Sequence, residues 1–226
     1  MGVKLLDDVI NQPVLFKFFL PNQPISRQFG YDRGTPIDRY YIDRFLKQYE
    51  QKIKGDVLEV GETGYTKQFG QNVRQAYALV LNKGNQNNEL AADLNLPDSF
   101  PENKFDCFIC PQTFQYVHDV EVAVKSCLRL LKPGGVFLGS MPAISQRSTL
   151  PKDTWSDQWR FSRESLERIF GKIFGDSNIQ VTACGNVRVA AAFLYGLALE
   201  EISKKILDSH DPDYECLITV YAKKNG

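Results

Sequence analysis

The residues best suited to chemistry lie in one short stretch, residues 54–66 (KGDVLEVGETGYT). Residues 57–60 are typical of a buried strand, and a loop that contains Gly61 and Gly64 follows at once. A strand that runs into a glycine turn and a helix brings backbone N–H groups close to a nucleotide-like ligand. Glu59 adds a carboxylate at the end of this strand, which is costly to bury without a partner. The stretch therefore indicates a site for a cation or for hydroxyl and ammonium donors; the alternative is an ordinary turn with a solvated Glu59.

Three more polar side chains follow predicted strands at the point where each strand ends. They are Asn82 after residues 77–81, Asp93 after residues 90–92, and Gln112 after residues 105–110. In a parallel sheet the carboxyl ends of the strands share one edge, where ligands bind. The spacing thus predicts that these residues and the glycine loop form one site.

The elements that must position this site alternate between helix and strand. The pattern predicts helices at about residues 36–53, 67–75, 120–131, 163–174 and 187–207, and further strands at 136–139, 179–183 and 217–222. The run of apolar residues at 105–110 is typical of a strand covered by helices on both faces. Repeated alternation at short intervals predicts an α/β protein with a doubly wound, mostly parallel sheet.

Composition narrows the class of protein. A chain of 226 residues fits a single domain, and 27 Lys and Arg balance 27 Asp and Glu, so we expect no nucleic-acid partner. No apolar run is long enough to cross a membrane, and the charged amino-terminal stretch does not resemble a signal peptide, so we expect a cytoplasmic protein.

Cys107 and Cys110 have C-x-x-C spacing but lie in an apolar strand without a second ligand pair. We interpret them as core thiols and expect no metal.

At this point four segments resemble the class I S-adenosylmethionine-dependent methyltransferases. They are VLEVGETG (57–64), AADLNLP (91–97), FDCFICPQTFQYVHD (105–119) and LRLLKPGGVFLGSMP (128–142), of which the last is the most specific. Two further segments, YDRGTPIDRYYI (31–42) and WSDQWRFS (155–162), look like a bacterial, methyltransferase type 11-like subgroup often found with glycan or natural-product tailoring enzymes.

The resemblance implies a seven-stranded Rossmann-like methyltransferase fold with helical cap elements and S-adenosylmethionine as cofactor. Within the one domain, it implies an amino-terminal cap and helix (1–54), a cofactor-binding core (55–142) and an acceptor side (143–226). The residues implied to bind the cofactor are Arg33, Tyr40, Glu59, Gly61, Gly64, Asn82, Asp93, Leu94 and Gln112. Among them, Glu59 and Gly61 would lie near the methionine part, Asn82 near the ribose, Asp93 and Leu94 near the adenine, and Gln112 near the sulfonium.

Other residues are candidates for the acceptor side. The candidate catalytic residues are His118, Tyr116 and Asp32, because transfer to a hydroxyl needs a base. The candidate substrate-binding residues are Trp155, Trp159, Arg160 and Asn186. Aromatic rings suit sugars or planar acceptors, and an arginine suits a carboxylate or phosphate. We expect the helix at 187–207 to cap the acceptor side, because so long a connection between two strands is normally functional or independently structured.

The sequence therefore predicts O-methylation of a small-molecule or glycan-like acceptor by a monomer or homodimer. The alternative is a non-catalytic S-adenosylmethionine-binding module of the same fold. Two departures from the family pattern suggest it: the glycine loop is one residue short, and Asn82 stands where the family has an acid. A dinucleotide such as NAD is disfavoured, because the G-x-G-x-x-G pattern is absent.

Overall fold

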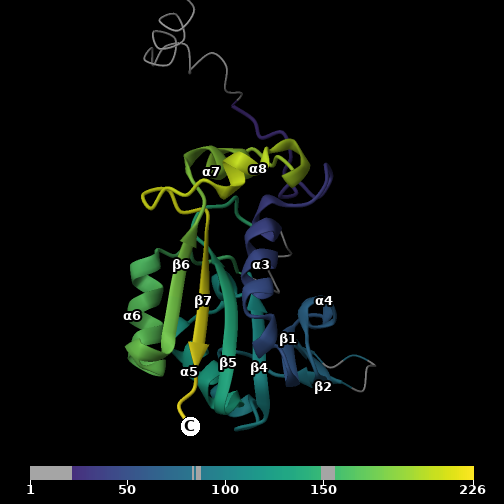
Figure 1. The fold of residues 1–226 in the computed structure, drawn as a ribbon, viewed down its shortest axis with the longest axis vertical. Helices are drawn as coiled ribbons and strands as arrows, with labels where there is room; N and C mark the ends of the chain where they lie inside the picture. The colour runs from purple at the N-terminus through teal and green to yellow at the C-terminus, as the bar shows by residue number, and fades with distance from the viewer. Residues whose placement is uncertain (1–21, 83, 85–87, 149–155) are drawn as a thin grey trace, which may run out of the picture.

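A computed structural model describes residues 22–82, 84, 88–148 and 156–226 of the chain. In these residues a seven-stranded sheet has the order β3-β2-β1-β4-β5-β7-β6 (Figure 1). The strands are β1 (Gly55–Val60), β2 (Val73–Val80), β3 (Glu89–Ala91), β4 (Phe105–Pro111), β5 (Leu131–Pro142), β6 (Ile179–Cys184) and β7 (Leu217–Lys223). Only β7 is antiparallel to its neighbours, so β6 runs parallel to β5 and ends at the same edge as β1 and β4. The expectation of a doubly wound, mostly parallel sheet is confirmed.

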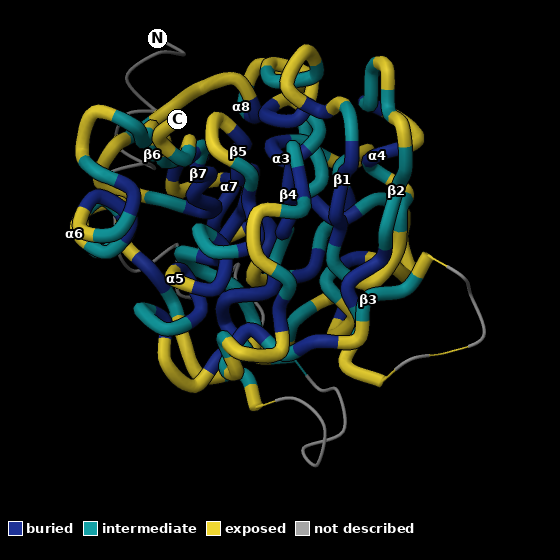
Figure 2. The backbone as a smooth tube through the Cα atoms, turned by 90° about the horizontal axis from the view of Figure 1, so that it is seen from below, coloured by how far each residue is buried: buried dark blue, intermediate teal, exposed yellow. Residues whose placement is uncertain are grey.

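Helices cover both faces of the sheet. One face packs against α5 (Val120–Leu130) and α6 (Arg163–Phe174), and the other against α3 (Ile37–Gln48). In β4, Phe108 belongs to the first of these cores, whereas Cys107 and Ile109 belong to the second. This two-sided burial explains the continuous apolar run in the sequence. Figure 2 shows the buried strands enclosed by more exposed loops and helix faces.

Two element boundaries differ from expectation. The predicted polar helix at 67–75 is α4 (Gly64–Phe69), and β2 begins at Val73, where it pairs with Gly55 of β1. Pairing with a central strand overrides the local helical pattern of residues 73–75. The predicted helix at 187–207 is divided into α7 (Val187–Leu194), a short 3-10 turn and α8 (Lys204–Asp208).

The division after α7 has a steric cause at Gly196. Its φ is +72°, and a Cβ on this residue would lie 2.4 Å from the carbonyl oxygen of Ser26. The same segment accepts backbone hydrogen bonds, because Ile25 and Ser26 both donate to the carbonyl of Tyr195. A glycine with positive φ ends a helix readily. The chain therefore turns there and packs closely against residues 25–26.

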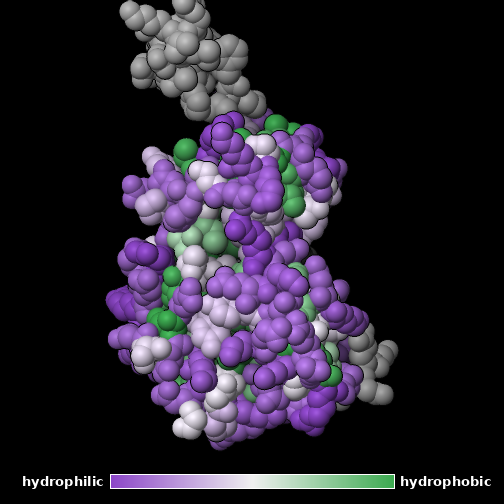
Figure 3. Space-filling view, viewed as in Figure 1, coloured by the Kyte–Doolittle hydropathy of each residue, from purple (hydrophilic) through white to green (hydrophobic). Residues whose placement is uncertain are grey.

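Helices α7 and α8 lie with residues 22–35 beyond the carboxyl edge of the sheet, and together we call them the cap (Figure 1). The location of 187–207 at this edge agrees with the expected cap. The face shown in Figure 3 is mostly hydrophilic, with small hydrophobic areas on the cap and below it. No helix in the described ranges is long and apolar enough to cross a membrane.

Both cysteines of the C-x-x-C pair are core residues. Cys107 and Cys110 are fully buried, and burial raises the pKa of the Cys110 thiol to about 12. Their interpretation as core thiols is confirmed.

Candidate functional site at the carboxyl edge of the sheet

Glu59 is the buried carboxylate at the end of β1, and it has partners within the chain. Its Oε1 accepts a hydrogen bond of 3.0 Å from the backbone N–H of Tyr65. Its Oε2 accepts from the backbone N–H and hydroxyl of Thr66, at 2.8 and 2.7 Å. Burial raises the pKa of Glu59, and these hydrogen bonds oppose the shift. The carboxylate therefore fixes the start of α4 and the shape of the preceding glycine loop.

The glycine loop presents open space on its outer side. Gly61 has a φ of +80° and donates its N–H to the carbonyl of Leu79 at 2.8 Å. A Cβ added at Gly61 or at Gly64 would meet no atom of the described residues within 4 Å. No described segment packs against these two glycines, so the space beside the loop is available to a ligand.

A small cavity of about 50 Å³ lies beside this loop, lined by the ends of β1 and β2 and by the segment after β3. Asp93 and Leu94 both line it. Asp93 Oδ1 accepts from the backbone and side-chain nitrogens of Asn95, at 2.9 and 2.8 Å, which fixes the carboxylate. Asn82 is exposed and follows Leu81, which lines the cavity. The two residues predicted to lie near the adenine thus line one cavity, whereas Asn82, predicted to lie near the ribose, does not line it.

A second, larger cavity of about 410 Å³ lies under the cap. The residues that line it are Arg27, Gln28, Phe29, Tyr31, Pro36, Asp38, Arg39, Gln112, Gln115, Tyr116, Ser145, Gln146, Ser148, Asp157 and Phe193. Tyr116 lines both cavities, so they adjoin at this residue. Phe193 comes from α7, so the cap contributes a side chain to this cavity.

Asp38 and Gln112 form the polar floor of the second cavity. Gln112 has a φ of +47°, which is uncommon for a non-glycine residue and signals a local constraint. Its Nε2 donates a 3.0 Å hydrogen bond to Asp38 Oδ2. Burial raises the pKa of Asp38, while Arg39 and the Gln112 hydrogen bond oppose the shift. The Nε of Arg39 lies 3.9 Å from Asp38 Oδ1, beyond hydrogen-bonding distance.

Arg39 is the basic group of this cavity. Its two terminal nitrogens donate to the hydroxyls of Tyr65 and Tyr31, at 2.9 and 2.8 Å. Tyr65 belongs to α4, so the guanidinium connects α3 with the segment after the glycine loop. The sequence reasoning missed Asp38, Arg39 and Gln115 as site residues. The available signal was the position of Asp38 and Arg39 in the first turn of a helix that follows a glycine-containing loop.

The candidate catalytic residues are separated in space. His118 is exposed, and its Nδ1 lies 2.9 Å from Gln158 Nε2 in a depression lined also by Trp159. Asp32 is exposed and accepts a hydrogen bond from Ser26 Oγ on the cap. Neither residue lines the two cavities, so the expectation for His118 and Asp32 is not supported by their positions. Only Tyr116 of this group reaches the cavities.

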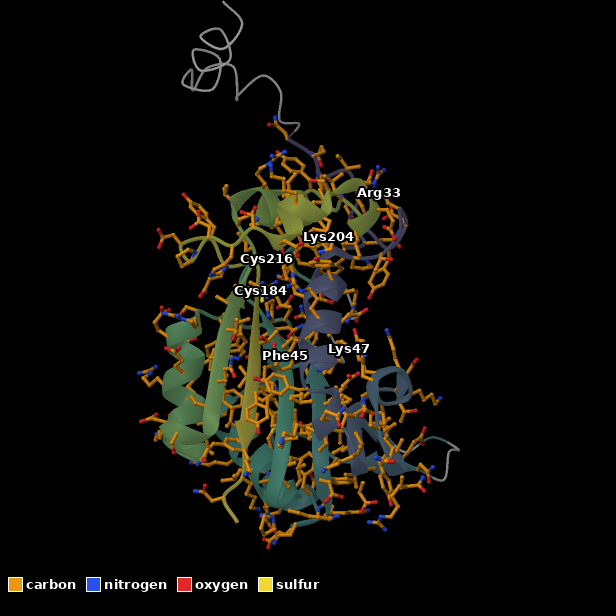
Figure 4. The ribbon with its side chains drawn as sticks, viewed as in Figure 1. Arg33, Phe45, Lys47, Cys184, Lys204 and Cys216 are labelled. Carbon is orange, nitrogen blue, oxygen red and sulfur yellow. The ribbon has the colours of Figure 1, made fainter. Side chains whose placement is uncertain are left out.

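Two predicted cofactor residues also lie elsewhere. Arg33 sits on the cap (Figure 4), where its Nε donates a 3.0 Å hydrogen bond to Glu201. The hydroxyl of Tyr40 donates to Asp208 Oδ1 at 2.5 Å and faces a groove on the other side of α3. Their separation from the glycine loop argues against both assignments. The sequence could not show which side of α3 Tyr40 would occupy relative to the cavity.

The predicted acceptor residues need correction as well. Trp155 lies outside the described residues. Trp159 is 39% exposed and donates its Nε1–H to the carbonyl of Val117 at 2.8 Å, which attaches its loop to the body. Arg160 is used within the same loop: it pairs with Asp157 and donates to the carbonyl of Gln146 at 2.9 Å. Neither Trp159 nor Arg160 lines the two adjoining cavities.

Asn186 is occupied by its own chain. Its Oδ1 accepts from the backbone N–H groups of Arg188 and Val189 at the start of α7. Its Nδ2 donates to the carbonyls of Ile206 and Ser209, both at 2.8 Å. Because an asparagine side chain offers two donors and two acceptor positions, no capacity remains for an acceptor molecule. The expected acceptor contact is therefore replaced by a structural role between α7 and α8.

Comparison with known proteins shows which class of fold the chain has. The family model for a methyltransferase domain matches residues 62–139. A search of curated protein sequences finds no match.

Three similar solved structures illustrate the likeness. Phosphoethanolamine N-methyltransferase 2 of Haemonchus contortus, in complex with S-adenosyl-L-methionine, has 17% identity and a TM-score of 0.52, with 83% of this chain and 53% of that chain covered. An S-adenosylmethionine-dependent methyltransferase from Mesorhizobium loti has 15% identity and a TM-score of 0.50, with 86% and 100% covered. The 1,6-didemethyltoxoflavin-N1-methyltransferase of Burkholderia thailandensis has 14% identity and a TM-score of 0.50, with 82% and 77% covered. This chain spans about half the length of the Haemonchus enzyme.

These similarities define the class of protein: the chain has the Rossmann-like methyltransferase fold. Within it, the segment from the glycine loop to β5 matches a methyltransferase domain. Because the sequence identity is 14–17%, the structural likeness shows the fold alone.

Proposed function

We propose that this protein binds S-adenosylmethionine beside the Gly61–Gly64 loop and transfers its methyl group to a small or glycan-like acceptor, at oxygen. The observation that supports this best is the pair of cavities that adjoin at Tyr116. One lies beside the strand ends where this fold receives a nucleoside. The other is large enough for a small acceptor and lies under the cap. We assign residues 55–142 to cofactor binding and 143–226, with the amino-terminal cap, to the acceptor side.

The residues present fit the proposed cofactor. The open side of Gly61 and Gly64 allows close approach of a ligand to the backbone. Asp93 Oδ1 is used by Asn95, whereas Oδ2 has no hydrogen-bond partner among the described residues and suits an adenine amino group. Leu94 supplies an apolar surface for the base, and Asn82 an amide for the ribose. Arg39 supplies the positive charge that the methionine carboxylate requires.

Catalysis by this chain would consist mainly of positioning. When bound, S-adenosylmethionine supplies a methyl group that is already electrophilic. Tyr116, which borders both cavities, would orient the acceptor hydroxyl, and the surrounding cap would exclude water. Well-oriented reactants gain up to several orders of magnitude in rate from proximity alone.

The alternative is a binding module without catalysis. It is favoured by the positions of His118 and Asp32, which leave the adjoining cavities without either of these candidate bases. Calorimetric titration with S-adenosylmethionine and S-adenosylhomocysteine tests the part shared by both proposals. Incubation with methyl-labelled S-adenosylmethionine and a panel of hydroxylated metabolites then separates them. Tight cofactor binding with no label transferred to any acceptor would favour the binding module, and no cofactor binding would contradict both.

A further inference from the structure

We propose that the second cavity recognises its acceptor through an ammonium group, which hydrogen-bonds to oxygens of Asp38, Gln112 and Gln115. This proposal rests on the proposed function and names the chemical class of the acceptor. The ammonium group serves as an anchor, and the methylated atom lies elsewhere on the same molecule.

The first support is a set of buried oxygens without partners. Asp38 Oδ1, Gln112 Oε1 and Gln115 Oε1 have no hydrogen-bond partner within the described structure. Asp38 is 5% exposed and Gln115 is 7% exposed, and all three residues line the second cavity. A buried acceptor without a partner costs about 1–3 kcal/mol. Three such atoms, all on residues that line one cavity, indicate that a ligand completes them.

The orientation of both amides is fixed, so the unpaired atoms are oxygens. Gln112 Nε2 donates to Asp38 Oδ2, and Gln115 Nε2 donates to the backbone carbonyl of Gln112 at 2.9 Å. Turning either amide over would place its oxygen against another acceptor. These three positions therefore offer acceptors alone, and the part of the ligand that meets them must supply N–H or O–H groups.

The number and charge of these groups favour ammonium. A primary ammonium has three donors and no acceptor, which matches three acceptor oxygens. One of the oxygens belongs to a buried carboxylate, and among the described residues the nearest cation is Arg39, at 3.9 Å. Hydrogen bonds between ionised groups are about twice as strong as neutral ones.

The aromatic lining of the cavity provides the second support. Phe29, Tyr31, Tyr116 and Phe193 all line it, and the rings of Phe29 and Phe193 have centroids 6.2 Å apart. Aromatic faces attract cations through their quadrupole. A cavity with aromatic sides and an oxygen-rich floor is thus suited to a cation attached to an apolar or sugar-like body.

Three matched probes test the chemistry: benzylamine, benzyl alcohol and benzoate. Each is titrated against the protein saturated with S-adenosylhomocysteine, and dissociation constants are measured by ligand-observed NMR. We expect benzylamine to bind at least about tenfold more tightly than the other two. Equal or tighter binding of benzoate or benzyl alcohol, or no binding of benzylamine at millimolar concentration, would overturn the proposal.

Substitutions test whether these oxygens bind benzylamine. Asp38→Asn and Gln115→Leu should each weaken benzylamine binding by about tenfold or more, with thermal unfolding confirming that the proteins fold. Asp43→Asn is the matched control, since Asp43 lies on the same helix but faces the groove on its other side. Unchanged benzylamine affinity in either of the first two variants would contradict the assignment.

Binding of S-adenosylhomocysteine separates this proposal from the proposed function. We expect Asp38→Asn and Gln115→Leu to bind it as the wild type does. A parallel loss of its affinity would show that the oxygens hold the cofactor's own ammonium group and would overturn the acceptor assignment. If the wild type fails to bind S-adenosylhomocysteine, the proposed function fails, and the probe series is run on the protein alone with the same criteria.

Discussion

The side-chain amide of Gln112 donates a 3.0 Å hydrogen bond to the buried carboxylate of Asp38, although the two residues are 74 positions apart. This bond joins the end of β4 to the first turn of α3. It therefore attaches the amino-terminal helix to the strand end where the two cavities meet. Substitution of either residue is expected to alter the second cavity more than the distant parts of the sheet.

Glu59→Ala should weaken S-adenosylhomocysteine binding by at least about tenfold, because the carboxylate holds two backbone N–H groups that shape the glycine loop. Calorimetry measures the affinity, and thermal unfolding measures the accompanying loss of stability. Glu62→Ala, in the exposed part of the same loop, is the control. A folded Glu59→Ala protein with wild-type affinity would show that the loop does not depend on this carboxylate.

Asp93→Asn should weaken cofactor binding by about tenfold while preserving the fold. The asparagine keeps an oxygen for the turn with Asn95 but loses the second carboxylate oxygen that we assign to the adenine amino group. Asp98→Asn is a suitable control, because Asp98 lies in the same segment and forms an ion pair with Arg129 at the surface. If both variants bind the cofactor with the affinity of the wild type, Asp93 is not part of the cofactor site.

Arg160→Ala should lower the midpoint of thermal unfolding without changing cofactor affinity. The guanidinium pairs with Asp157, whose side chain is 4% exposed, and bonds to the carbonyl of Gln146. Removing it leaves a buried carboxylate without its ion-pair partner, which is a destabilising change. Arg163→Ala, on the exposed start of α6, is the control. Reduced acceptor turnover per folded molecule, with unchanged stability, would instead restore Arg160 to the acceptor site.

Asn186→Ala should destabilise the protein by about 2 kcal/mol, because it removes the cap of α7 and both side-chain bonds to the segment at α8. Denaturant unfolding gives this value. Asn186→Asp keeps the capping oxygen but places a second oxygen against the carbonyls of Ile206 and Ser209, so it should also be less stable than the wild type. If both variants are as stable as the wild type, the proposed structural role is wrong.

The contribution of Asp38 to stability should fall as pH rises above about 4, the ordinary range of an aspartate, toward the raised pKa of folded Asp38. In this window the folded state binds the proton more tightly than the unfolded state does, so deprotonation costs stability. The charged or titratable groups near Asp38 are Arg39 and Asp43 of α3, Tyr65 of α4, and Cys216 before β7.

Asp38→Asn isolates this contribution. The unfolding free energies of the two proteins, measured by urea titration between about pH 4 and pH 8, should diverge in favour of the variant as pH rises and then run parallel. A constant difference across this range would exclude Asp38 as the source of the pH dependence.

The sequence by itself determined the order of the elements and the edge of the sheet where the site lies. The apolar runs of β1 and β4 indicate strands covered on both faces, and Asn82, Asp93 and Gln112 follow strand ends. Parallel strands necessarily bring these ends together. The glycine loop and the residues around the small cavity were therefore predictable from local pattern alone.

Only the tertiary structure decided which side chains face the cavities. Successive residues of a helix point in directions about 100° apart, so Asp38 and Tyr40 lie on different sides of α3 although both carry a polar group in the same turn. Asn186 and Arg160 carry groups suited to a ligand, but other parts of the chain use them: Asn186 donates to the carbonyls of Ile206 and Ser209, and Arg160 donates to the carbonyl of Gln146. Such neighbours depend on how α7, α8 and the loop after β5 pack, which short-range spacing does not encode.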